Sequence, residues 1–463
     1  MTPTDARVVN LGLSVLGEAV AAQGAAVVQV DWRPPAGGDA SAVRALTDLY
    51  GPRSVDIDPA NAEVLRRLDT GVPMLVDVRT AGDLVPGLGD RTLLHPGPPI
   101  AWDEVCDPLR RSMRAAVVAE GWAPDLAGAE AMLARGRVAL AAANEHATVV
   151  PMATALGPSM PVWVVDNAAG GTRAFAPIGQ GPGDVAWMGR ESPAAIARLV
   201  FQRDIAGPRL ARIVARLGPV DVFALAAQGV QMGDDVHMRT QASTNLLIRT
   251  MLPAIAALGG DPGTVAFCEY LSANHLFFLT LAMAGAKSLT LAAEQVEGST
   301  MVTTMARNGT TYGVRLAGSD RWFLAPAPPV EDALFQPGYG PADAGLDIGD
   351  SAVLELVGLG GPATAGSPAV AAFLGGSMAD AARVTEAMRR ICAAESSRFK
   401  LPTLDFRGTP LGVDVRLVVE TGVTPRVNTG ILHAQAGLGQ VGAGVATAPP
   451  AVFRDALLAL RAD

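Results

Sequence analysis

The sequence predicts an α/β fold, and three observations along the chain support this. The first 95 residues alternate apolar, strand-like runs with segments of helical spacing. Residues 192–298 are mainly helical, and the last third returns to β-rich runs. Because 463 residues are too many for one core, we expect about three domains.

The N-terminal segment has the pattern strand, helix, strand. Residues 6–12 ("ARVVNLG") and 25–32 ("AAVVQVDW") are apolar runs, and residues 13–24 between them have helical spacing. A helical segment at 61–71 and a strand at 73–78 repeat the pattern. Short links between such elements predict a parallel sheet with right-handed crossovers, and thus a Rossmann-like scaffold.

A dinucleotide site in this scaffold is an alternative that the residues leave open. Asp31 lies 19 residues after Gly12, where a dinucleotide fold would hold a ribose. Only one glycine of the G-x-G-x-x-G fingerprint is present, however. An NAD-dependent oxidoreductase therefore rests on this unit alone.

The rest of the chain divides into a helical insert, a helical middle part and a β-rich end. Two helices at 102–121 and 125–136 form the insert, after which strands at 137–143 and 160–167 are expected to resume the sheet. We place a Rossmann-like domain at 1–168 with its helical insert near 102–136. A mainly helical domain at 169–298 and an α+β domain at 299–463 follow.

Three local patterns are specific enough to test. Asn308-Gly309 between two β-rich runs, 301–316, predicts a hairpin. Residues 411–422 alternate like another strand. The segment 275–294 has eleven uncharged residues between His275 and Lys287, too few to span a bilayer, and predicts a buried helix.

Composition excludes several classes of function. The net charge is −9 without a run of lysine or arginine, and aromatic residues make up 5%, so a nucleic-acid groove is not expected. A mean hydropathy of +0.29 suggests large internal interfaces or a partner subunit. The three cysteines are far apart and fit no zinc or redox spacing, so we predict a cytoplasmic protein without metal or cofactor.

The segment "AAQGVQMGDDVHMRT" (226–240) concentrates charge in an otherwise apolar region. Helical spacing would put Asp234 beside His237 and Asp235 beside Arg239. A carboxylate behind an imidazole fixes its tautomer for proton transfer, and Arg239 would hold a carboxylate or phosphate. The alternative is a polar helix start, in which Gly233 ends one helix and Asp234 caps the next.

Other polar residues are predicted to bind substrate. Lys287 interrupts an apolar helix, so it must reach solvent or meet a buried partner, and an anionic substrate would serve. Arg307 ends a strand and suits an anion, whereas Asn308 followed by Gly309 is better explained by turn chemistry than by catalysis. The predicted substrate-binding residues are His146, Asn274, Lys287, Arg307, Asn308 and Arg407.

A second glycine fingerprint lies near the C-terminus. Gly437, Gly439 and Gly442 match G-x-G-x-x-G, but we expect Pro449-Pro450 to prevent the long helix that a pyrophosphate needs. A glycine-rich nest for a smaller anion is the alternative.

Strings distributed over nearly the whole chain resemble the YlbE-like family, which includes a subunit of the oxamate carbamoyltransferase of anaerobic allantoin breakdown. In chain order they are "VVQVDWRPPAGGD", "HPGPPIAWDEVCDPLRRSMRAAVVAEGWA", "SMPVWVVDN", "QMGDDVHMRTQAST", "FFLTLAMAGAK", "EGSTMVTTMARNG", "DIGDSA", "FRGTPLGVDV" and "NTGILHAQAGLGQVGAG".

The resemblance implies a Rossmann-like N-terminal domain with a small helical insert and two further α+β domains. It also implies carbamoyl transfer between oxalurate and phosphate, giving oxamate and carbamoyl phosphate, in a hetero-oligomer with an FdrA-type subunit. Such a reaction passes through an oxyanion, for which we assign Arg239, Arg307 and Lys287 as donors, and His237 with Asp234 as the proton shuttle.

The chain departs from the family pattern in polar motifs. Asp235 and Thr240 stand in the middle motif where the family has glutamate and asparagine, and "GQG" around Gln180 replaces "NEG". These changes leave open a related ureido acid or amide as substrate. They also leave open a non-catalytic structural or regulatory subunit that binds an anion or an acyl-CoA-like ligand in an FdrA-type complex.

Overall fold

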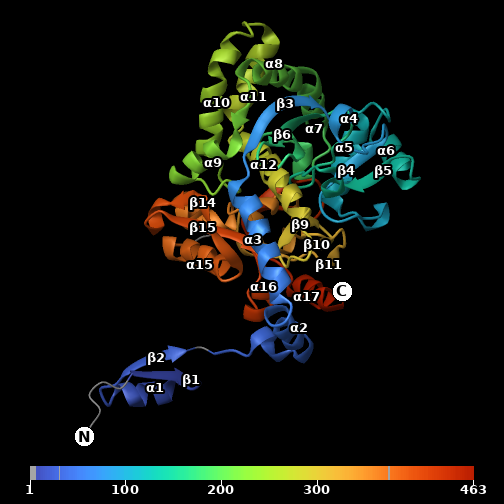
Figure 1. Cartoon of the computed structure of the whole chain (residues 1–463). Helices are drawn as coiled ribbons and strands as arrows, with labels where there is room; N and C mark the ends of the chain where they lie inside the picture. Colours follow the sequence, from blue (N-terminus) through green and yellow to red (C-terminus); the bar gives the residue numbers. More distant parts are fainter. Residues whose placement is uncertain (1–6, 31, 374–375, 463) are drawn as a thin grey trace.

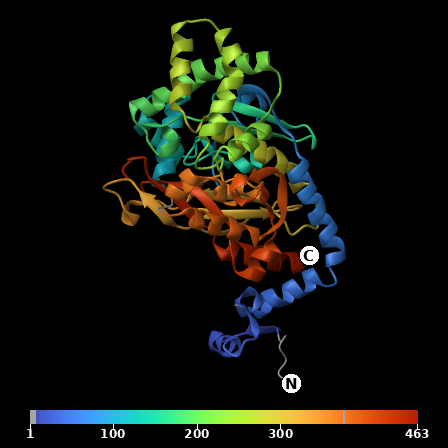
Figure 2. The same cartoon turned by 90° about the vertical axis from the view of Figure 1, so that its left-hand side faces the viewer.

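The computed structural model describes residues 7–30, 32–373 and 376–462, which form a mixed α/β structure with several separate sheets. Figure 2 shows two stacked parts, with helices from the middle of the chain above and C-terminal strands and helices below. α3 (Ser54–Thr70) runs along the side of both parts. The predicted α/β class is confirmed.

A small unit of two strands and one helix forms the N-terminal end of the described chain. β1 (Arg7–Leu11) and β2 (Ala26–Val30) pair in parallel, and α1 (Ser14–Ala21) connects them, as predicted. The unit lies apart from the other elements in Figure 1. Asp31, the proposed ribose ligand, lies outside the described residues.

The apolar side chains of this unit are largely exposed, because a two-stranded sheet has no second layer to cover it. The exposed large side chains between residues 9 and 32 are Val9, Leu11, Leu13, Val15, Leu16, Val28 and Trp32. Even the largest of these side chains, Trp32, is 63% exposed.

The strand predicted at 73–78 belongs to a different sheet. β3 (Pro73–Thr80) lies between β6 (Pro161–Asn167) and β8 (Val220–Asp221) and pairs antiparallel with both. β7 (Arg173–Pro177) pairs with β6 across the predicted domain boundary at 168. The expected continuation of the parallel sheet is therefore wrong for β3. β3 does not continue the sheet of β1 and β2, because α2 (Ala40–Tyr50) and α3 lie between β2 and β3 in the chain. α3 alone is about 25 Å long, so β3 begins far from β2.

The helical insert is present, but the strand after it does not resume the earlier sheet. α5 (Asp107–Ala119) and α6 (Leu126–Ala134) are the two predicted helices. β5 (Ala139–Ala142) pairs in parallel with β4 (Thr92–His95) in a sheet of their own. Short helices flank this region: α4 (Ala81–Leu84), η2 (Trp102–Glu104), η3 (Ala143–His146) and η4 (Ala186–Met188).

Helices of the middle region pack around α12 (Phe277–Glu294). α12 is long and apolar enough to cross a membrane, yet 89% of it is buried inside the protein, as expected of a core helix. Trp163 on β6 donates to the Thr280 hydroxyl of α12 over 3.0 Å. α9 (Val222–Gln231) and α10 (Gln241–Ala256) contact α12, and Tyr270 of α11 (Pro262–Ala273) packs on Phe277. The region also contains α7 (Pro193–Phe201), η5 (Gln202–Ala206) and α8 (Gly207–Leu217).

Three sheets form the C-terminal part. β9 (Val302–Asn308) and β10 (Thr311–Leu316) are the predicted hairpin, extended by β11 (Phe323–Pro326) and β13 (Ile348–Gly349). The second sheet has the order β12 (Val330–Phe335), β17 (Gln440–Thr447), β16 (Arg426–Leu432). β14 (Cys392–Leu401) and β15 (Arg407–Val413) form the third.

Further helices and turns join these strands: η1 (Pro35–Gly38), η6 (Pro341–Asp343), α13 (Val353–Leu356), η7 (Gly361–Gly366), α14 (Pro368–Phe373), α15 (Met378–Arg389), η8 (Pro402–Leu404), α16 (Val415–Thr421) and α17 (Pro450–Ala462).

Two predictions in this part are wrong. The strand expected over 411–422 ends at Val413, because Asp414 accepts the backbone N–H of Arg416 and caps α16. Pro449-Pro450 does not prevent a helix, since α17 starts at Pro450, a position where the backbone N–H that proline lacks would have no intrahelical partner anyway. α17 follows β17 rather than the glycines, so the fingerprint at 437–442 still lacks its helix.

Candidate functional site

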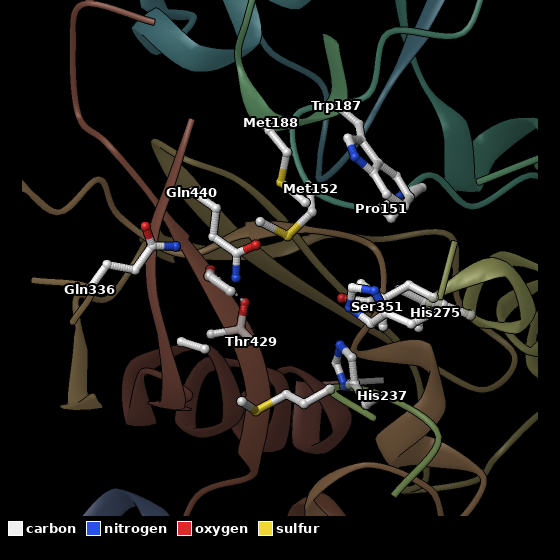
Figure 3. A pocket seen from close by; sticks show the side chains of 15 residues that line it. Pro151, Met152, Trp187, Met188, His237, His275, Gln336, Ser351, Thr429 and Gln440 are labelled. Atoms are coloured by element: carbon white, nitrogen blue, oxygen red, sulfur yellow. Dashed lines mark hydrogen bonds between the residues drawn. The ribbon is translucent and has the colours of Figure 1, made fainter. Parts of the chain in front are cut away.

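A cavity of about 250 Å³ lies where the helical middle region meets the C-terminal sheets (Figure 3). Its walls come from loops and elements far apart in sequence. The lining residues are Pro151, Met152, Trp187, Met188, His237, Met238, His275, Leu276, Leu279, Gln336, Ser351, Thr429, Gly430, Gln440 and Ala443. We call this cavity the inner chamber.

The inner chamber combines apolar walls with a few polar groups, as small-molecule sites do. Trp187 and Met188 from η4 and Met152 provide apolar surface. Thr429 and Gln440 lie on the paired strands β16 and β17. Among the residues that the structure describes, no lysine or arginine lines this chamber.

His237 and Glu355 form a buried hydrogen-bonded pair at the chamber wall. The distance from His237 Nδ1 to Glu355 Oε1 is 2.7 Å, and Glu355 is fully buried. The same carboxylate oxygen accepts the backbone N–H groups of Gly361 and Asn428, at 3.2 and 3.3 Å. Because Nδ1–H donates to a carboxylate, Nε2 is the ring nitrogen left for a guest.

The segment 234–239 that presents His237 is a tight turn, not the helix that the spacing suggested. The Asp235 carboxylate accepts backbone N–H groups from His237, Met238 and Arg239 at 2.8–3.2 Å. Val236 between them has φ +62°, an uncommon conformation for a β-branched residue, which such over-determined turns can hold.

Asp234 has a different role from the one predicted. It accepts the backbone N–H groups of Ala242 and Ser243 at the start of α10, and it pairs with Arg239. Asp234 is therefore not the partner of His237. Its side chain accepts free N–H groups of the next helix, as in the alternative interpretation, although the N-cap residue of α10 is Thr240. Turn geometry, rather than helical spacing, decides which carboxylate reaches the imidazole.

Two residues hold the His237–Glu355 pair in place. Gly360 has φ +62°, and a Cβ there would lie 2.0 Å from Glu355 Oε1 and 3.0 Å from His237 Nδ1, so only glycine fits. Asn428 on β16 donates its side-chain amide to Asp235 over 2.7 Å, while its backbone N–H reaches Glu355. One strand thus positions both carboxylates.

His275 enters the chamber from the turn between α11 and α12. The hydroxyls of Thr240 and Thr244 donate to its carbonyl, at 3.0 and 3.1 Å, and thereby fix this turn beside the His237 segment. Partial burial lowers the pKa of His275. Its imidazole therefore favours the neutral state at the chamber wall.

The predicted cationic donors are already paired inside the protein. Lys287 Nζ lies 2.8 Å from Glu294, Arg307 forms a bidentate pair with Asp347 at 2.8 and 3.1 Å, and Arg239 pairs with Asp234. None of the three lines the chamber. The expectation that they converge on an anionic guest is wrong, because buried charges are satisfied by neighbouring carboxylates.

The other predicted substrate-binding residues divide into remote and adjacent ones. His146 Nδ1 donates to the carbonyl of Pro86 over 2.7 Å, Asn308 Oδ1 accepts the backbone N–H groups of Thr310 and Thr311 in the hairpin turn, and Arg407 is an exposed partner of Glu395. None of these three lines the chamber. Asn274, in contrast, borders a second cavity.

This second cavity, the outer chamber, has a volume of about 420 Å³ and shares a wall with the first. Trp187, Met188, His275, Leu276, Gln336 and Gln440 line both chambers. The outer chamber adds Gly181, Pro182, Gly183, Asp184, Arg190 and Asn274. The two chambers are therefore neighbours, and we refer to them together as the cleft.

The sequence interpretation missed Glu355, Ser351, Gln336, Gln440 and Arg190. Glu355 carried a usable signal, since it is the one acidic residue in the apolar stretch "SAVLELVGLGG", residues 351–361. A lone charge in such a stretch needs a buried partner. The two glutamines and Arg190 had no distinguishing pattern.

Comparisons with known proteins agree on the relatives of this chain. A family model described as "Oxamate carbamoyltransferase subunit AllG" matches residues 138–351. The AllG protein of Escherichia coli K12 is 39% identical over 406 residues, covering 87% of this chain and 97% of AllG. The "uncharacterized protein YahG" of the same organism is 36% identical and covers 97% and 96%.

One solved structure shares the fold. The crystal structure of a conserved protein of unknown function from Enterococcus faecalis V583 superposes with a TM-score of 0.86 at 35% identity. It covers 89% of this chain and 99% of that protein. The fold described above is therefore found in an experimentally determined relative.

Proposed function

The chain belongs to the family of the oxamate carbamoyltransferase subunit AllG, and from this premise we propose that it is a subunit of a carbamoyltransferase. The proposed substrates are a small ureido acid and phosphate. In the simplest case oxalurate and phosphate give oxamate and carbamoyl phosphate. The proposed location is the cytoplasm, and the proposed partner is an FdrA-type subunit.

The observation that carries this proposal is the His237–Glu355 pair at the wall of a small chamber. In the proposed reaction a phosphate oxygen forms a bond to the carbamoyl carbon, and the bond from that carbon to the ureido nitrogen breaks. The proton lost by hydrogen phosphate must reach the departing nitrogen. His237 Nε2 is suited to relay it, while buried Glu355 stabilises the imidazolium, a contribution of about 10²–10⁴ in rate.

The chamber walls support the same chemistry. Trp187, Met188 and Met152 give an apolar surround, in which hydrogen bonds to a developing oxyanion are stronger than in water. Ser351 lines the chamber and has a hydroxyl able to donate to the carbonyl oxygen. The Thr429 hydroxyl is not available for this, because it donates to Asp347 over 3.0 Å.

The N-terminal unit supports the proposed hetero-oligomer. Its exposed apolar side chains and two unpaired sheet edges are features that a partner subunit would cover. The relative AllG is itself named as a subunit.

The experiment is reconstitution. The chain is coexpressed with an FdrA-type subunit from the same genome, and carbamoyl phosphate formation is measured with phosphate and a panel of ureido acids that includes oxalurate. We expect phosphate-dependent turnover of at least one ureido acid that disappears when this chain is left out. Absence of turnover across the panel in an assembled complex would refute the proposal.

A further inference from the structure

Two buried acceptors among the described residues that line the outer chamber, Asn274 Oδ1 and Asp184 Oδ1, have no hydrogen-bond partner, and only the first belongs to a neutral amide. Asn274 is 1% exposed, and its side-chain nitrogen donates to the Gly179 carbonyl over 3.1 Å. This bond fixes the orientation of the amide, so Oδ1 is the acceptor facing elsewhere, and within the described part of the chain it receives no hydrogen bond. Leaving a buried acceptor unpaired is costly, which points to a guest that carries an N–H.

The loop at 179–184 is shaped around this amide. Gly181 has φ +82°, and a Cβ there would lie 3.6 Å from the Asn274 amide. The Tyr270 hydroxyl donates to the same Gly179 carbonyl. Asn274 is therefore held rigidly at the border between loop and helix.

The outer chamber also contains a cation, Arg190, whose side chain is 35% exposed. It donates to the Leu438 carbonyl through Nη2, and Asp184 Oδ1 lies 4.0 Å from its Nε. The other oxygen of Asp184 accepts the Ser192 hydroxyl at 2.6 Å. Because Asp184 already offsets part of the charge of Arg190, this chamber suits a singly charged carboxylate better than a phosphate dianion.

We propose that the outer chamber binds the acid end of a small acid amide, with Arg190 on its carboxylate and Asn274 Oδ1 accepting the adjacent N–H. The inference rests on the proposed function, since it orients the carbamoyl group of a ureido acid towards His237 in the inner chamber. The two chambers adjoin at His275 and Gln440, and the proposed guest would extend from one into the other past these side chains. Asn274 and Arg190 then determine specificity, whereas His237 performs the proton transfer.

The test measures equilibrium binding to the full chain by calorimetry, with three probes and no turnover. Oxamate carries both an acid and an N–H, oxalate carries acid alone, and acetamide carries N–H alone. Wild type should prefer oxamate, because a buried acceptor rejects an analogue that lacks its donor. Arg190→Gln should weaken oxamate roughly tenfold to a hundredfold, and Asn274→Ala should abolish the preference for oxamate over oxalate.

Matched controls separate the site from general effects. Arg173→Gln removes an arginine that pairs with Asp166 on the β6–β7 hairpin, and Asn245→Ala removes an exposed asparagine on α10. Both should bind oxamate as wild type does. Unchanged oxamate affinity in Arg190→Gln, unchanged discrimination in Asn274→Ala, or no saturable oxamate binding by wild type would overturn the proposal. Each result is independent of the turnover assay that tests the proposed function.

Discussion

The Arg307–Asp347 pair and the His237–Glu355 pair are both buried and share support from β16, yet only one of them borders the cleft. Thr429 donates to Asp347, and the preceding residue, Asn428, donates its backbone N–H to Glu355. Arg307 and Asp347 are joined by two hydrogen bonds, and the third guanidinium nitrogen, Nη1, is buried without a hydrogen-bond partner among the described residues. His237 has one ring nitrogen on Glu355 and lines the inner chamber with the other side of its ring.

The difference separates buried pairs of charged side chains that stabilise the fold from those that can act on a guest. A pair buried away from the cavities stabilises the fold, because each charge compensates the other and neither side chain lines a chamber. A pair in which one imidazole nitrogen is left for a guest at a cavity wall can take part in proton transfer. Residue type and burial alone do not distinguish the two.

The largest effect on stability is expected from removing the carboxylate of the Arg307–Asp347 pair. Asp347→Asn removes the hydrogen-bonded counter-charge of the buried Arg307 guanidinium and leaves Glu355 as a further carboxylate that acts on it, so we expect a cost of about 3 kcal/mol in the free energy of unfolding. Urea denaturation measures it. Asp166→Asn, in the exposed pair with Arg173, is the control and should cost less than about 1 kcal/mol. Equal losses in both variants would mean that the buried pair is not structural.

Removing the carboxylate of the His237–Glu355 pair should affect turnover more than folding. Glu355→Gln keeps the side-chain shape but removes the charge that orients the imidazole and stabilises its protonated form. We expect kcat of the assembled complex to fall by about a hundredfold or more. Steady-state kinetics with the substrate found by reconstitution measures this. A fall in complex assembly with unchanged kcat would place Glu355 among the structural residues instead.

A Lys287 variant tests whether a buried, paired cation stabilises the fold or binds substrate. Because its ammonium is fully buried and paired with Glu294, Lys287→Met should destabilise the protein by about 1–3 kcal/mol. The KM for the ureido acid should stay within about twofold of wild type. A KM increase of tenfold or more would restore Lys287 as a substrate ligand.

The smallest expected effect is on the pH dependence of stability. Two buried groups, Asp350 and His95, contribute to this dependence with opposite sign. Burial raises the pKa of Asp350 to about 7, so its contribution to stability falls as pH rises from about 4 to 7. Burial lowers the pKa of His95 to about 4, so the unfolded chain alone gains that proton below about pH 6.5, and stability rises with pH over the same window.

In the wild type the contributions of Asp350 and His95 oppose each other between about pH 4.5 and 6.5. Asp350→Asn removes only the falling contribution, so the stability of this variant should rise with pH across that window. Urea unfolding at three pH values measures the slope. A flat profile in Asp350→Asn would contradict the assignment of the two buried groups.

Local features were predictable from the sequence, whereas long-range pairing was not. The Asn308-Gly309 hairpin and the buried helix around Lys287 are confirmed, because turn chemistry and hydrophobic length act within a few residues. The family resemblance is confirmed by 39% identity to AllG. The partner of β3 could not be predicted, because alternation of strands and helices does not encode the order in which strands pair.

The candidate site shows the same limit. His237 was identified from its polar segment and does line the chamber. Its partner Glu355 is 118 residues away, and the nearer acids Asp234 and Asp235 are used by backbone N–H groups instead. Sequence proximity therefore selected the wrong carboxylate.

The most direct measurement compares His237→Asn with His146→Asn in the assembled complex. His146 hydrogen-bonds to the Pro86 carbonyl outside the cleft, so its replacement matches the chemistry of the change without altering the chamber. The account predicts that His237→Asn lowers kcat by at least about a hundredfold while oxamate affinity and complex assembly stay near wild type, and that His146→Asn retains activity. Wild-type kcat in His237→Asn would contradict it.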